Sequence, residues 1–343
     1  MNNLLQASII IATYNRAFYL SRCLAALATL ETDPTKFEII IVDNNSSDNT
    51  RDISLNFTQA HLTLKTRYMC EIKQGSSHAR NRGVEESCGE IVCFLDDDSV
   101  PTPDWLNVLL EMFNDPQMGC VGGPSILDYQ GQELPYWLQG DLQGLLSSYA
   151  LPYSEPTQVS RWTEFPLSCN MAIRRSIFTD LGFLRTDLGK LADQTLAAGD
   201  TELADRITKA GWKVVYVPEM CVRHFVQPEK LSITYLYQRG RGLAESHIIL
   251  TSDDSRPHMI GRWFISDLWY SIRMLFWLIV AILRRKQLWF DDYMRFWMVA
   301  NRIPLRMKIL QQRYFQFLKA EDQSYELSEI EKPPQPKSVS PRC

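Results

Sequence analysis

The chain has 343 residues, of which 45% are hydrophobic and 22% are charged, and this ordinary globular composition excludes a disordered chain or a fibrous repeat. The length is more than one average domain and less than three. The net charge of −4 is unevenly distributed: residues 1–255 carry 21 basic and 32 acidic side chains, whereas residues 256–319 carry 12 basic and three acidic ones. Five of the nine tryptophans lie in the second stretch, so an acidic body precedes a basic, aromatic segment.

Short apolar runs alternate with helical patterns over the first hundred residues. They predict strands at 7–12, 37–42, 62–68 and 90–95, and helices at 17–30, from about 47, and at 76–87. Strands that are apolar throughout and alternate with helices imply a mostly parallel sheet covered on both faces. Polar clusters end three of these strands, which is where the ligands of open α/β sheets bind. Residues 1–100 are therefore predicted to form a nucleotide-binding α/β half-domain.

The rest of the chain divides into three parts. Over residues 101–230 the α/β pattern continues, with a helix at 104–113, loops at 120–168, an apolar run at 167–174, a helix at 200–210 closed by Gly211, and a strand at 212–217. Residues 231–320 are predicted to be helical, basic and aromatic. The acidic, proline-rich residues 321–343 are predicted to be a disordered tail.

The eight cysteines include no CxxC pair and no zinc-ligand spacing with a histidine. Most of them lie beside apolar residues, so we expect reduced and mainly buried thiols, which are typical of a cytosolic protein. Residues 1–7 lack the charged and apolar regions of a signal peptide. The sequence therefore predicts a cytoplasmic location.

Three adjacent carboxylates, Asp96, Asp97 and Asp98, follow the predicted strand at 90–95. Adjacent carboxylates repel one another, and a divalent cation, which prefers oxygen ligands, would offset that repulsion. The alternative is a solvated acidic turn that caps the next helix. The apolar strand before the motif and the sequence SVPTPDW after it favour the cation site.

Two more polar residues belong to the same edge of the predicted sheet. Asp43 ends the strand at 37–42, and its carboxylate could accept hydrogen bonds from a ribose or a base edge; alternatively it forms an N-cap or an Asx turn. Arg80 lies in the segment GSSHARNRG. Its guanidinium could contact phosphate or order the acidic loop; alternatively it lies on a basic surface helix.

Two candidates come from the second half of the domain. Asp200 opens the predicted helix at 200–210. It is either a general base at the rim of the crevice or a helix N-cap, and the two roles compete for the same oxygens. His224 follows the strand at 212–217; a neutral histidine is a common metal ligand, and the alternative is a structural histidine.

Six segments that carry these residues occur in order along the chain: ASIIIATYNR, IIIVDNNSSDNT, GSSHARNRG, VCFLDDDSVPTPDWL, CNMAIRR and AGDTELADRITKAGWKVVYVPEMCVRHF. In this order and spacing, the chain resembles the family 2 glycosyltransferases, inverting nucleotide-sugar enzymes of the GT-A fold. The resemblance covers about residues 7–226. It implies a GT-A-type α/β domain over residues 1–230, with a mostly parallel central sheet and an acceptor half at 101–230.

The resemblance also implies roles for individual residues. The residues that would contact the nucleotide, ribose or diphosphate of the donor are Thr13, Tyr14, Asn15, Arg16, Asp43, Arg80, Asp96 and Asp97. Asp96 and Asp98 match the outer residues of the family's D-x-D motif, and with His224 they would hold Mn²⁺ or Mg²⁺. Asn170 and Glu202 are the residues assigned to the donor sugar and the acceptor.

Asp200 matches the second acid of the family's Glu-Asp pair, which is the catalytic base. An inverting transfer needs one base to deprotonate the acceptor hydroxyl and a cation to neutralise the leaving nucleoside diphosphate. The chain departs from the family at Gly199, where glutamate is usual, and at Ala12, where proline is frequent. The first departure removes a possible contact with the acceptor.

The C-terminal extension contains a strongly apolar stretch at residues 263–283. Asp267 and Arg273 interrupt it, and the uncharged run 274–283 is only ten residues long, whereas a membrane span needs about 20 apolar residues. Basic residues with Trp and Phe on amphipathic helices are typical of a segment at an anionic membrane interface. We therefore predict peripheral association with the cytoplasmic face of a membrane; the alternatives are a helical cap on the domain and a true span.

The predicted function is that of a metal-dependent, hexosyltransferase-like glycosyltransferase. It would move a sugar from a nucleotide diphosphate-sugar to a glycan or lipid-linked acceptor in cell-surface polysaccharide synthesis. One alternative is a sugar nucleotidyltransferase, although Thr-Tyr-Asn-Arg stands where such enzymes usually carry a glycine-rich basic loop. Another is a catalytically inactive glycan-binding pseudo-transferase, for which Gly199 is the argument. A nucleic-acid partner is not expected, because the body is acidic and no RNA- or DNA-binding module is visible.

Overall fold

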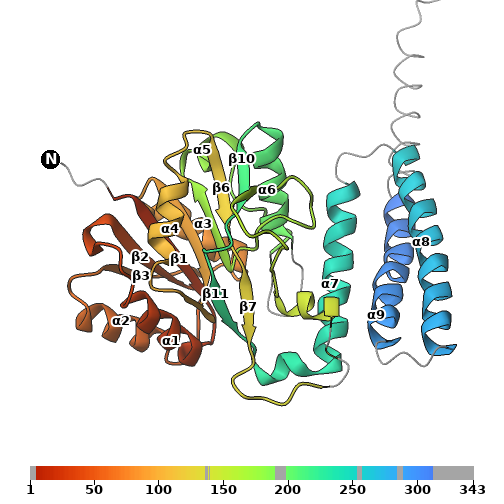
Figure 1. Cartoon of the computed structure of the whole chain (residues 1–343), viewed down its shortest axis with the longest axis horizontal. Coiled ribbons are helices and arrows are strands. Elements are labelled where there is room, and N and C mark those ends of the chain that lie inside the picture. Colours follow the sequence, from red (N-terminus) through yellow and green to blue (C-terminus); the bar gives the residue numbers. More distant parts are fainter. Residues whose placement is uncertain are drawn as a thin grey trace, which may run out of the picture.

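The computed structural model describes residues 5–135, 138, 140–189, 198–252, 257–283 and 289–311. An α/β body holds the first two thirds of the chain, and the described C-terminal helices stand side by side next to it (Figure 1). The predicted disordered tail at 321–343 lies outside the described residues.

Eight strands form the main sheet, in the order β3-β2-β1-β4-β9-β6-β10-β8. In the first half, β1 (Ala7–Thr13) pairs in parallel with β2 (Phe37–Asp43) on one side and with β4 (Ile91–Asp96) on the other. β3 (Lys65–Cys70) extends this half in parallel beyond β2. Because the four strands share one direction, their carboxyl ends lie at the same edge of the sheet. The predicted α/β class with a mostly parallel sheet is thus confirmed.

The second half of the sheet mixes directions. β9 (Asn170–Arg174) runs antiparallel between β4 and β6 (Met118–Gly122). β6 then pairs in parallel with β10 (Lys213–Tyr216), and β8 (Thr157–Gln158) closes the edge in antiparallel register. The predicted strand at 212–217 is therefore present as β10.

Helices cover both faces of this sheet. The first layer consists of α1 (Ala17–Leu27), α2 (Thr50–Ala60) and α4 (Trp105–Met112), and the second consists of α3 (Ser76–Glu86), α5 (Ser176–Leu181) and α6 (Gly199–Lys209). Within β1, Ile9 and Ile11 pack in the first layer's core and Ile10 in the second's. All three are at most 1% exposed, because a strand between two helical layers must be apolar on both sides. Past α6, Gly211 has φ +90°, the left-handed conformation in which helices commonly end.

A small second sheet lies at the edge that carries the polar clusters. Its strand order is β5-β11-β7, formed by β5 (Ser99–Pro101), β11 (Val222–Phe225) and β7 (Ser125–Asp128). β11 pairs antiparallel with β5 so that His224 lies opposite Ser99. The three acids directly precede β5 in the chain, so this pairing brings His224 beside them. β5, β7 and β11 have only three or four residues each, and no pattern in the sequence predicted them.

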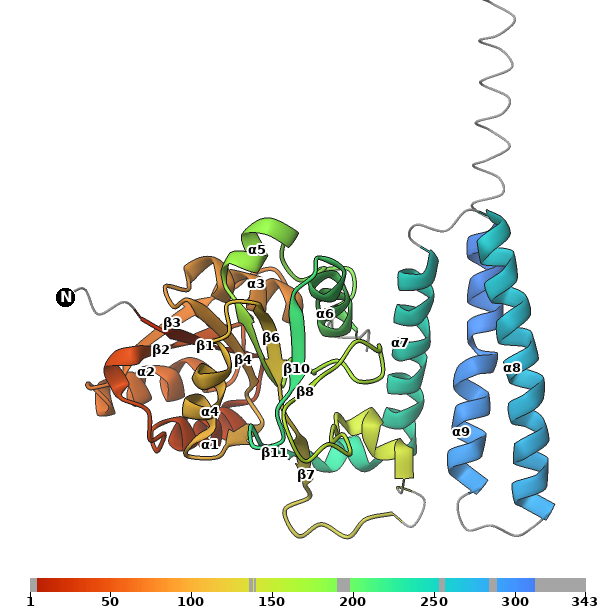
Figure 2. The ribbon, with the colours of Figure 1, turned by 45° about the horizontal axis from the view of Figure 1, so that its top comes forward.

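The C-terminal helices form a layered extension. α7 (Ile233–Ser252) lies next to the α/β body, α9 (Trp289–Ala300) lies against α7, and α8 (Pro257–Leu283) is outermost in both views (Figures 1 and 2). Residues 302–311 continue the helical backbone after α9. The short 3₁₀ turns elsewhere are η1 (Pro34–Lys36), η2 (Gly140–Leu146) and η3 (Pro228–Leu231).

A shared apolar cluster joins the body to α7 and α9. It contains Leu142 of η2, Val226 after β11, Leu236 of α7 and Met294 of α9, all at most 2% exposed. Gly240 of α7 allows close approach, because a Cβ atom there would lie 3.1 Å from the Met298 side chain. The extension is therefore packed onto the body through a third apolar cluster, which is separate from the two cores that flank the main sheet.

The cysteines only partly match the expectation of burial. Among the described residues, Cys23, Cys93, Cys120 and Cys169 are buried, and all seven described cysteines are free thiols. Cys70 and Cys88, however, are exposed, because they end β3 and follow α3 at the surface.

His247 of α7 makes the stability of the helical extension depend on pH. Burial, together with the nearby charges of Arg302 and Arg306, lowers the pKa of His247 to about 3. Its ordinary pKa is about 6.5, so between pH 6.5 and 3 the unfolded chain binds a proton that the folded chain does not. Stability therefore falls as the pH drops below 6.5, by about 1–2 kcal/mol at pH 5. Urea unfolding at pH 7 and pH 5 should show this loss in the native chain and a smaller one in His247→Gln; equal losses would contradict it.

Candidate functional site

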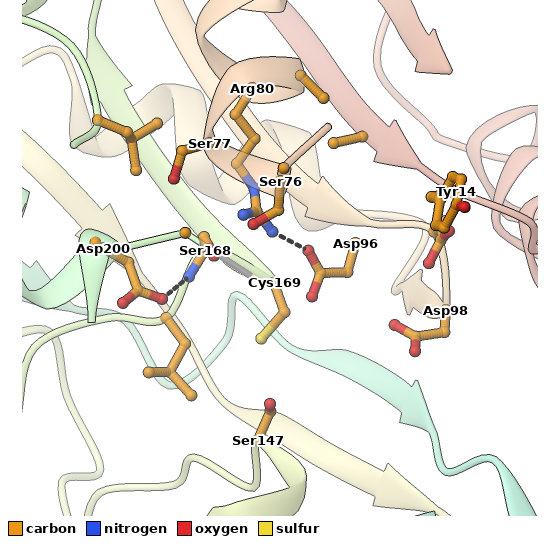
Figure 3. A pocket seen from close by; sticks show the side chains of 18 of the residues that line it. Tyr14, Ser76, Ser77, Arg80, Asp96, Asp98, Ser147, Ser168, Cys169 and Asp200 are labelled. Carbon is orange, nitrogen blue, oxygen red and sulfur yellow. Dashed lines mark hydrogen bonds and ion pairs between the residues drawn. The ribbon is translucent and has the colours of Figure 1, made fainter. Parts of the chain in front are cut away.

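A cavity of about 400 Å³ opens at the carboxyl ends of β1 and β4. Its lining residues come from the loop after β1, from α3, from the acidic turn after β4, from the start of α6 and from α7. The volume falls in the usual range for a small-molecule site. Figure 3 shows the acidic turn and Asp200 on opposite sides of this cavity, with Arg80 between them.

Asp98 is the most deeply engaged of the three acids and is 1% exposed. Its Oδ2 accepts hydrogen bonds from Arg16 Nη1 (3.0 Å), Gln227 Nε2 (2.8 Å) and Lys230 Nζ (3.2 Å). Burial alone would raise the pKa of Asp98, but the charges of His224, Lys230 and Arg16 hold that pKa well below its ordinary value. Asp98 is thus kept as a buried carboxylate, which is the form that binds a cation.

Each of the other two acids is paired with an arginine. Asp97 is 2% exposed, and its Oδ1 accepts from Arg16 Nη1 at 2.9 Å. Asp96 is the most open of the three, with 28% of its side chain exposed, and its Oδ1 accepts from Arg80 Nη2 at 2.6 Å (Figure 3). The negative charges of the three carboxylates are therefore nearly balanced by three cationic side chains around the turn, those of Arg16, Arg80 and Lys230. The alternative of a solvated acidic turn is wrong, because two of the three acids are buried.

Asp96, Asp98 and His224 form a group that fits a divalent cation. One ligand atom from each lies within 4.8 Å of the other two, and His224 Nε2 is 2.9 Å from Asp98 Oδ1. Asp98 Oδ1 is buried, and its polar neighbour is the imidazole of His224, the third member of the group. Two carboxylates and an imidazole are a donor set suited to Mn²⁺.

Asp200 lies across the cavity from the acidic turn. Its Oδ2 accepts from the backbone N of Ser168 at 3.0 Å and its Oδ1 from the backbone N of Thr201 at 2.8 Å (Figure 3). α6 begins at Gly199 with Ala198 as its N-cap residue, so the alternative of Asp200 as the N-cap is wrong. Asp200 is instead the second residue of the helix, where the helix dipole favours its negative charge and its carboxylate still lines the cavity.

The loop after β1 contributes Thr13, Tyr14 and Arg16 to the cavity lining. Asn15 points elsewhere: it has φ 52°, and its Oδ1 accepts from the backbone N of Ser47 at 2.7 Å. Asparagine tolerates this left-handed conformation better than most residues. Asn15 therefore ties the loop after β1 to the loop after β2, and α2 begins after this loop, at Thr50, where Asp48 Oδ1 accepts from the backbone N of Thr50.

Asp43 ends β2 and is 3% exposed. Its Oδ1 accepts from the backbone N of Ser46 at 2.9 Å, as in the Asx-turn alternative, and its Oδ2 accepts from the Tyr68 hydroxyl at 2.8 Å. Burial and the hydrogen bond to Asp43 raise the pKa of Tyr68. Asp43 lies beside the cavity and does not line it; its role toward a base or ribose stays a prediction.

Asn170 and Glu202 also lie outside the cavity lining. Asn170 is 1% exposed and joins three segments: its Nδ2 donates to Pro124 O and Met220 O, and its Oδ1 accepts from Trp105 Nε1. Glu202 pairs with Arg206 one helical turn away, at 2.8 Å. These contacts hold the fold together, and a role of either residue toward the sugar or acceptor stays a prediction.

Several residues that line or support the cavity were not predicted from the sequence. Gln227 and Lys230 reach Asp98 from the segment after β11, and neither belongs to a recognisable motif. Asn44 follows Asp43 and lines the cavity; its amide joins the loop after β2 to the loop before α3 through Glu71 O, Lys73 O and Gly75 N. Its position at a strand end could have signalled it. Tyr235, Arg239 and Leu243 of α7 line the far side of the cavity.

The Lys230 ammonium donates a hydrogen bond to Asp98 Oδ2. It therefore competes with a cation for the negative charge of this carboxylate. Replacing Lys230 with glutamine is expected to tighten Mn²⁺ binding in the absence of nucleotide by about tenfold, because a competing positive charge is removed from Asp98. Titration of the purified chain with Mn²⁺, followed by the electron paramagnetic resonance signal of free Mn²⁺, measures this. Lys230→Arg keeps the charge and should stay near the native affinity. Unchanged or weaker binding in Lys230→Gln would contradict the competition.

Known proteins match both the sequence and the fold. The family model described as Glycosyl transferase family 2 matches residues 8–182. The glycosyltransferase AglE of Haloferax volcanii is 26% identical over 258 residues, which are 75% of this chain and 79% of AglE. The succinoglycan biosynthesis protein ExoM of Rhizobium meliloti is 26% identical over 249 residues, which are 72% of this chain and 75% of ExoM.

Among solved structures, the mannosyltransferase PcManGT from Pyrobaculum calidifontis, in complex with GDP-Man and Mn²⁺, superposes with a TM-score of 0.60. The match covers 86% of this chain and 85% of PcManGT at 18% identity, so it shows the shared GT-A fold. The family match spans slightly more than half of the chain and includes the loop after β1, the acidic turn and all of β9 and α5. The chain belongs to glycosyl transferase family 2.

Proposed function

We propose that the chain transfers a sugar, with inversion at the anomeric carbon, from a nucleoside diphosphate-sugar to a glycan or lipid-linked acceptor. The reaction would depend on Mn²⁺ or Mg²⁺ and serve cell-surface polysaccharide synthesis at the cytoplasmic face of a membrane. The observation that carries the proposal is the pairing, across one cavity, of the isolated carboxylate Asp200 with the group Asp96, Asp98 and His224. That pairing supplies one base and one cation site, which is what a single displacement needs.

Asp200 is proposed as the base that accepts the proton of the acceptor hydroxyl as that oxygen attacks. Backbone N–H groups of Ser168 and Thr201 hold its two oxygens in place, so little reorientation is needed during the step. A cation held by Asp96, Asp98 and His224 would neutralise the leaving diphosphate. A displacement of this kind needs no covalent nucleophile from the chain.

The donor is proposed to lie between the loop after β1 and α3. Thr13, Tyr14 and Arg16 would contact the base and ribose, and Asn15 and Asp43 would act from beside the cavity. Arg80, Asp96 and Asp97 would surround the diphosphate. Support comes from Arg16 and Arg80, whose guanidinium groups pair with the acidic turn at the cavity wall and are suited to phosphate. PcManGT binds GDP-Man and Mn²⁺, and ExoM acts in succinoglycan biosynthesis, which agrees with the proposed donor class and pathway type.

The far side of the cavity is proposed to receive the acceptor. Tyr235, Arg239 and Leu243 of α7 line it, and this mixture of aromatic, cationic and aliphatic groups suits an acceptor with both polar and apolar parts. Asn170 and Glu202 would act indirectly, since both lie outside the lining. Their proposed part is to position β9 and α6.

The test is to incubate the purified full-length chain with a panel of UDP- and GDP-sugars and Mn²⁺, and to measure release of the nucleoside diphosphate. We expect release with at least one donor, loss of release after chelation, and an inverted anomeric configuration in the product by NMR. Retention of configuration would contradict the role of Asp200. Release of pyrophosphate from a nucleoside triphosphate and a sugar phosphate would indicate a nucleotidyltransferase. Absence of nucleotide-sugar binding by calorimetry would indicate an inactive glycan-binding protein.

A further inference from the structure

The outermost helix, α8, has its polarity reversed relative to a helix of a water-soluble protein. Its buried positions include Asp267 and Ser271, which are 5% and 6% exposed. Eleven large apolar side chains of the same helix are instead 37–65% exposed: Trp263, Ile265, Leu268, Trp269, Tyr270, Ile272, Leu275, Phe276, Trp277, Ile279 and Ile282. Apolar side chains normally turn inward, and exposed patches of this extent mark a binding surface.

The inward side of α8 explains this reversal. Asp267, Ser271 and Leu278 follow a spacing of four and seven residues and form one narrow seam toward α9 and residues 302–311. Within it, Asp267 Oδ2 accepts from Arg306 Nε at 2.5 Å, and Arg306 is fully buried. Arg306 Nη1 also donates to Thr251 of α7 at 3.2 Å. The polar side chains Asp267 and Ser271 are therefore paired inside the extension, and most of the exposed, described side chains of α8 are apolar.

We propose that the exposed face of α8 docks on the surface of an anionic lipid bilayer. Asp267 is buried and is the sole acidic residue of α8, whereas Arg262 and Arg273 lie on the exposed part of the helix. The surrounding stretch 256–319 has nine more basic than acidic residues. The Arg273 guanidinium lies 5.0 Å from the Tyr270 ring centre and 5.4 Å from that of Trp269. Aromatic rings with basic side chains suit the headgroup region, and the excess positive charge suits anionic lipid.

The arrangement of the helices determines how α8 meets the bilayer. By length and composition, Arg262–Val280 is apolar enough to cross a membrane, and 17% of it is buried. However, α7, α9 and α8 run side by side at the level of the α/β body (Figures 1 and 2). If α8 crossed a hydrocarbon layer of about 30 Å, the polar α/β body beside it would lie in that layer too. α8 therefore lies parallel to the membrane plane, with its outer face about 5–10 Å deep in the interface.

This surface gives a physical basis to the membrane association proposed above, and it does not depend on transfer activity. α7 has one side on the cavity, through Tyr235 and Leu243, and another on α9, through Tyr237, whose ring centre is 4.8 Å from that of Trp297. The bilayer would thus lie two helices away from the acceptor side of the cavity. A membrane-borne acceptor fits this separation.

The first experiment measures flotation of the full-length chain with vesicles of phosphatidylcholine containing about 30 mol% phosphatidylglycerol. We expect the native chain to float, and the double variant Trp269→Glu with Trp277→Glu to bind at least about tenfold more weakly. The matched control is Leu62→Glu with Ile72→Glu, which changes two side chains of the body that are 87% and 77% exposed; it should bind like the native chain. Equal binding of the tryptophan variant, or equal binding of the native chain to pure phosphatidylcholine, would overturn the proposal.

A second experiment tests the orientation. A nitroxide is introduced through an unnatural side chain at Ile265, Ile272 or Ile279, which are seven residues apart on one side of α8, so that native cysteines stay unlabelled. On vesicles, a flat helix predicts similar depths at all three positions, whereas a spanning helix predicts a change of about 21 Å from first to last. A depth gradient would overturn the flat orientation. If the chain forms a dimer without lipid and this dimer protects all three labels, the exposed face of α8 binds a second copy of the chain, and the bilayer proposal is overturned.

The two proposals can fail separately. Mn²⁺ binding reports on the group around Asp98, which lies in the α/β body, and the tryptophan variant should keep it unchanged. A chain that binds Mn²⁺ and nucleotide sugar but never floats would overturn the bilayer surface alone. A chain that floats but turns over no donor would overturn the proposed transfer alone.

Discussion

Replacing Asp200 with asparagine is expected to lower the rate of sugar transfer by about 10²- to 10⁴-fold, the usual contribution of a general base. The amide keeps the size of the carboxylate and one oxygen for the N–H groups of Ser168 or Thr201, but it cannot accept the acceptor proton. Release of nucleoside diphosphate at saturating donor measures the effect. Mn²⁺ affinity should stay near the native value, because Asp200 lies across the cavity from the group that would hold the cation.

Asp205→Asn is the matched control for this variant. Asp205 lies on the same helix and pairs with Lys209 at 2.7 Å, and it does not line the cavity. We expect its transfer rate to remain within about twofold of native, since surface pairs contribute little. If Asp200→Asn also kept its rate within that margin, Asp200 would not be the base.

Asp98→Asn is expected to weaken Mn²⁺ binding by more than about 100-fold, since the loss of even an indirect support of a metal ligand costs 10- to 100-fold. The same change should lower the free energy of unfolding by about 3 kcal/mol or more, because Arg16 and Lys230 lose the charge that they share at 3.0 and 3.2 Å. Calorimetric titration with Mn²⁺ and urea unfolding measure the two effects separately.

If the Asp98→Asn variant fails to fold, Asp96→Asn separates the effect on Mn²⁺ binding from the effect on stability. Asp96 is more open, with 28% of its side chain exposed, so we expect its replacement to weaken Mn²⁺ binding with a smaller loss of stability. Native Mn²⁺ affinity in both variants would rule out this group as the cation site. Native stability in Asp98→Asn would show that Arg16 and Lys230 find other partners.

These variants act on a site whose charges are already balanced. Arg16, Arg80 and Lys230 offset Asp96, Asp97 and Asp98, so the folded chain can bury the acids without a bound ion. A cation and a diphosphate donor carry opposite charges and could enter this site together at little net electrostatic cost. Lys230→Gln removes a positive charge from the network around Asp98, and Asp98→Asn removes the negative charge at its centre. The two variants therefore test the same charge network.

Some features of this protein were determined by the sequence alone, because they depend on local patterns. The strands β1, β2 and β4 are continuous apolar runs, and their ends carry Asp43 and Asp96–Asp98. Parallel direction follows from the alternation with helices, so the location of the acids at one edge could be predicted. The order of six motifs likewise identified the family that the family model later matched.

Other features were decided only by the tertiary structure. His224 reaches Asp98 through pairing of β11 with β5, and Lys230 and Gln227 reach it across separations of 132 and 129 residues. No local pattern marks such contacts, because they depend on which short strands and turns meet in space. Composition predicted a membrane-seeking segment, but not which helix faces outward. That was decided when Asp267 and Arg306 paired inside the extension, because a buried charge is stable only beside its partner, and the apolar remainder of α8 was thereby left on the surface.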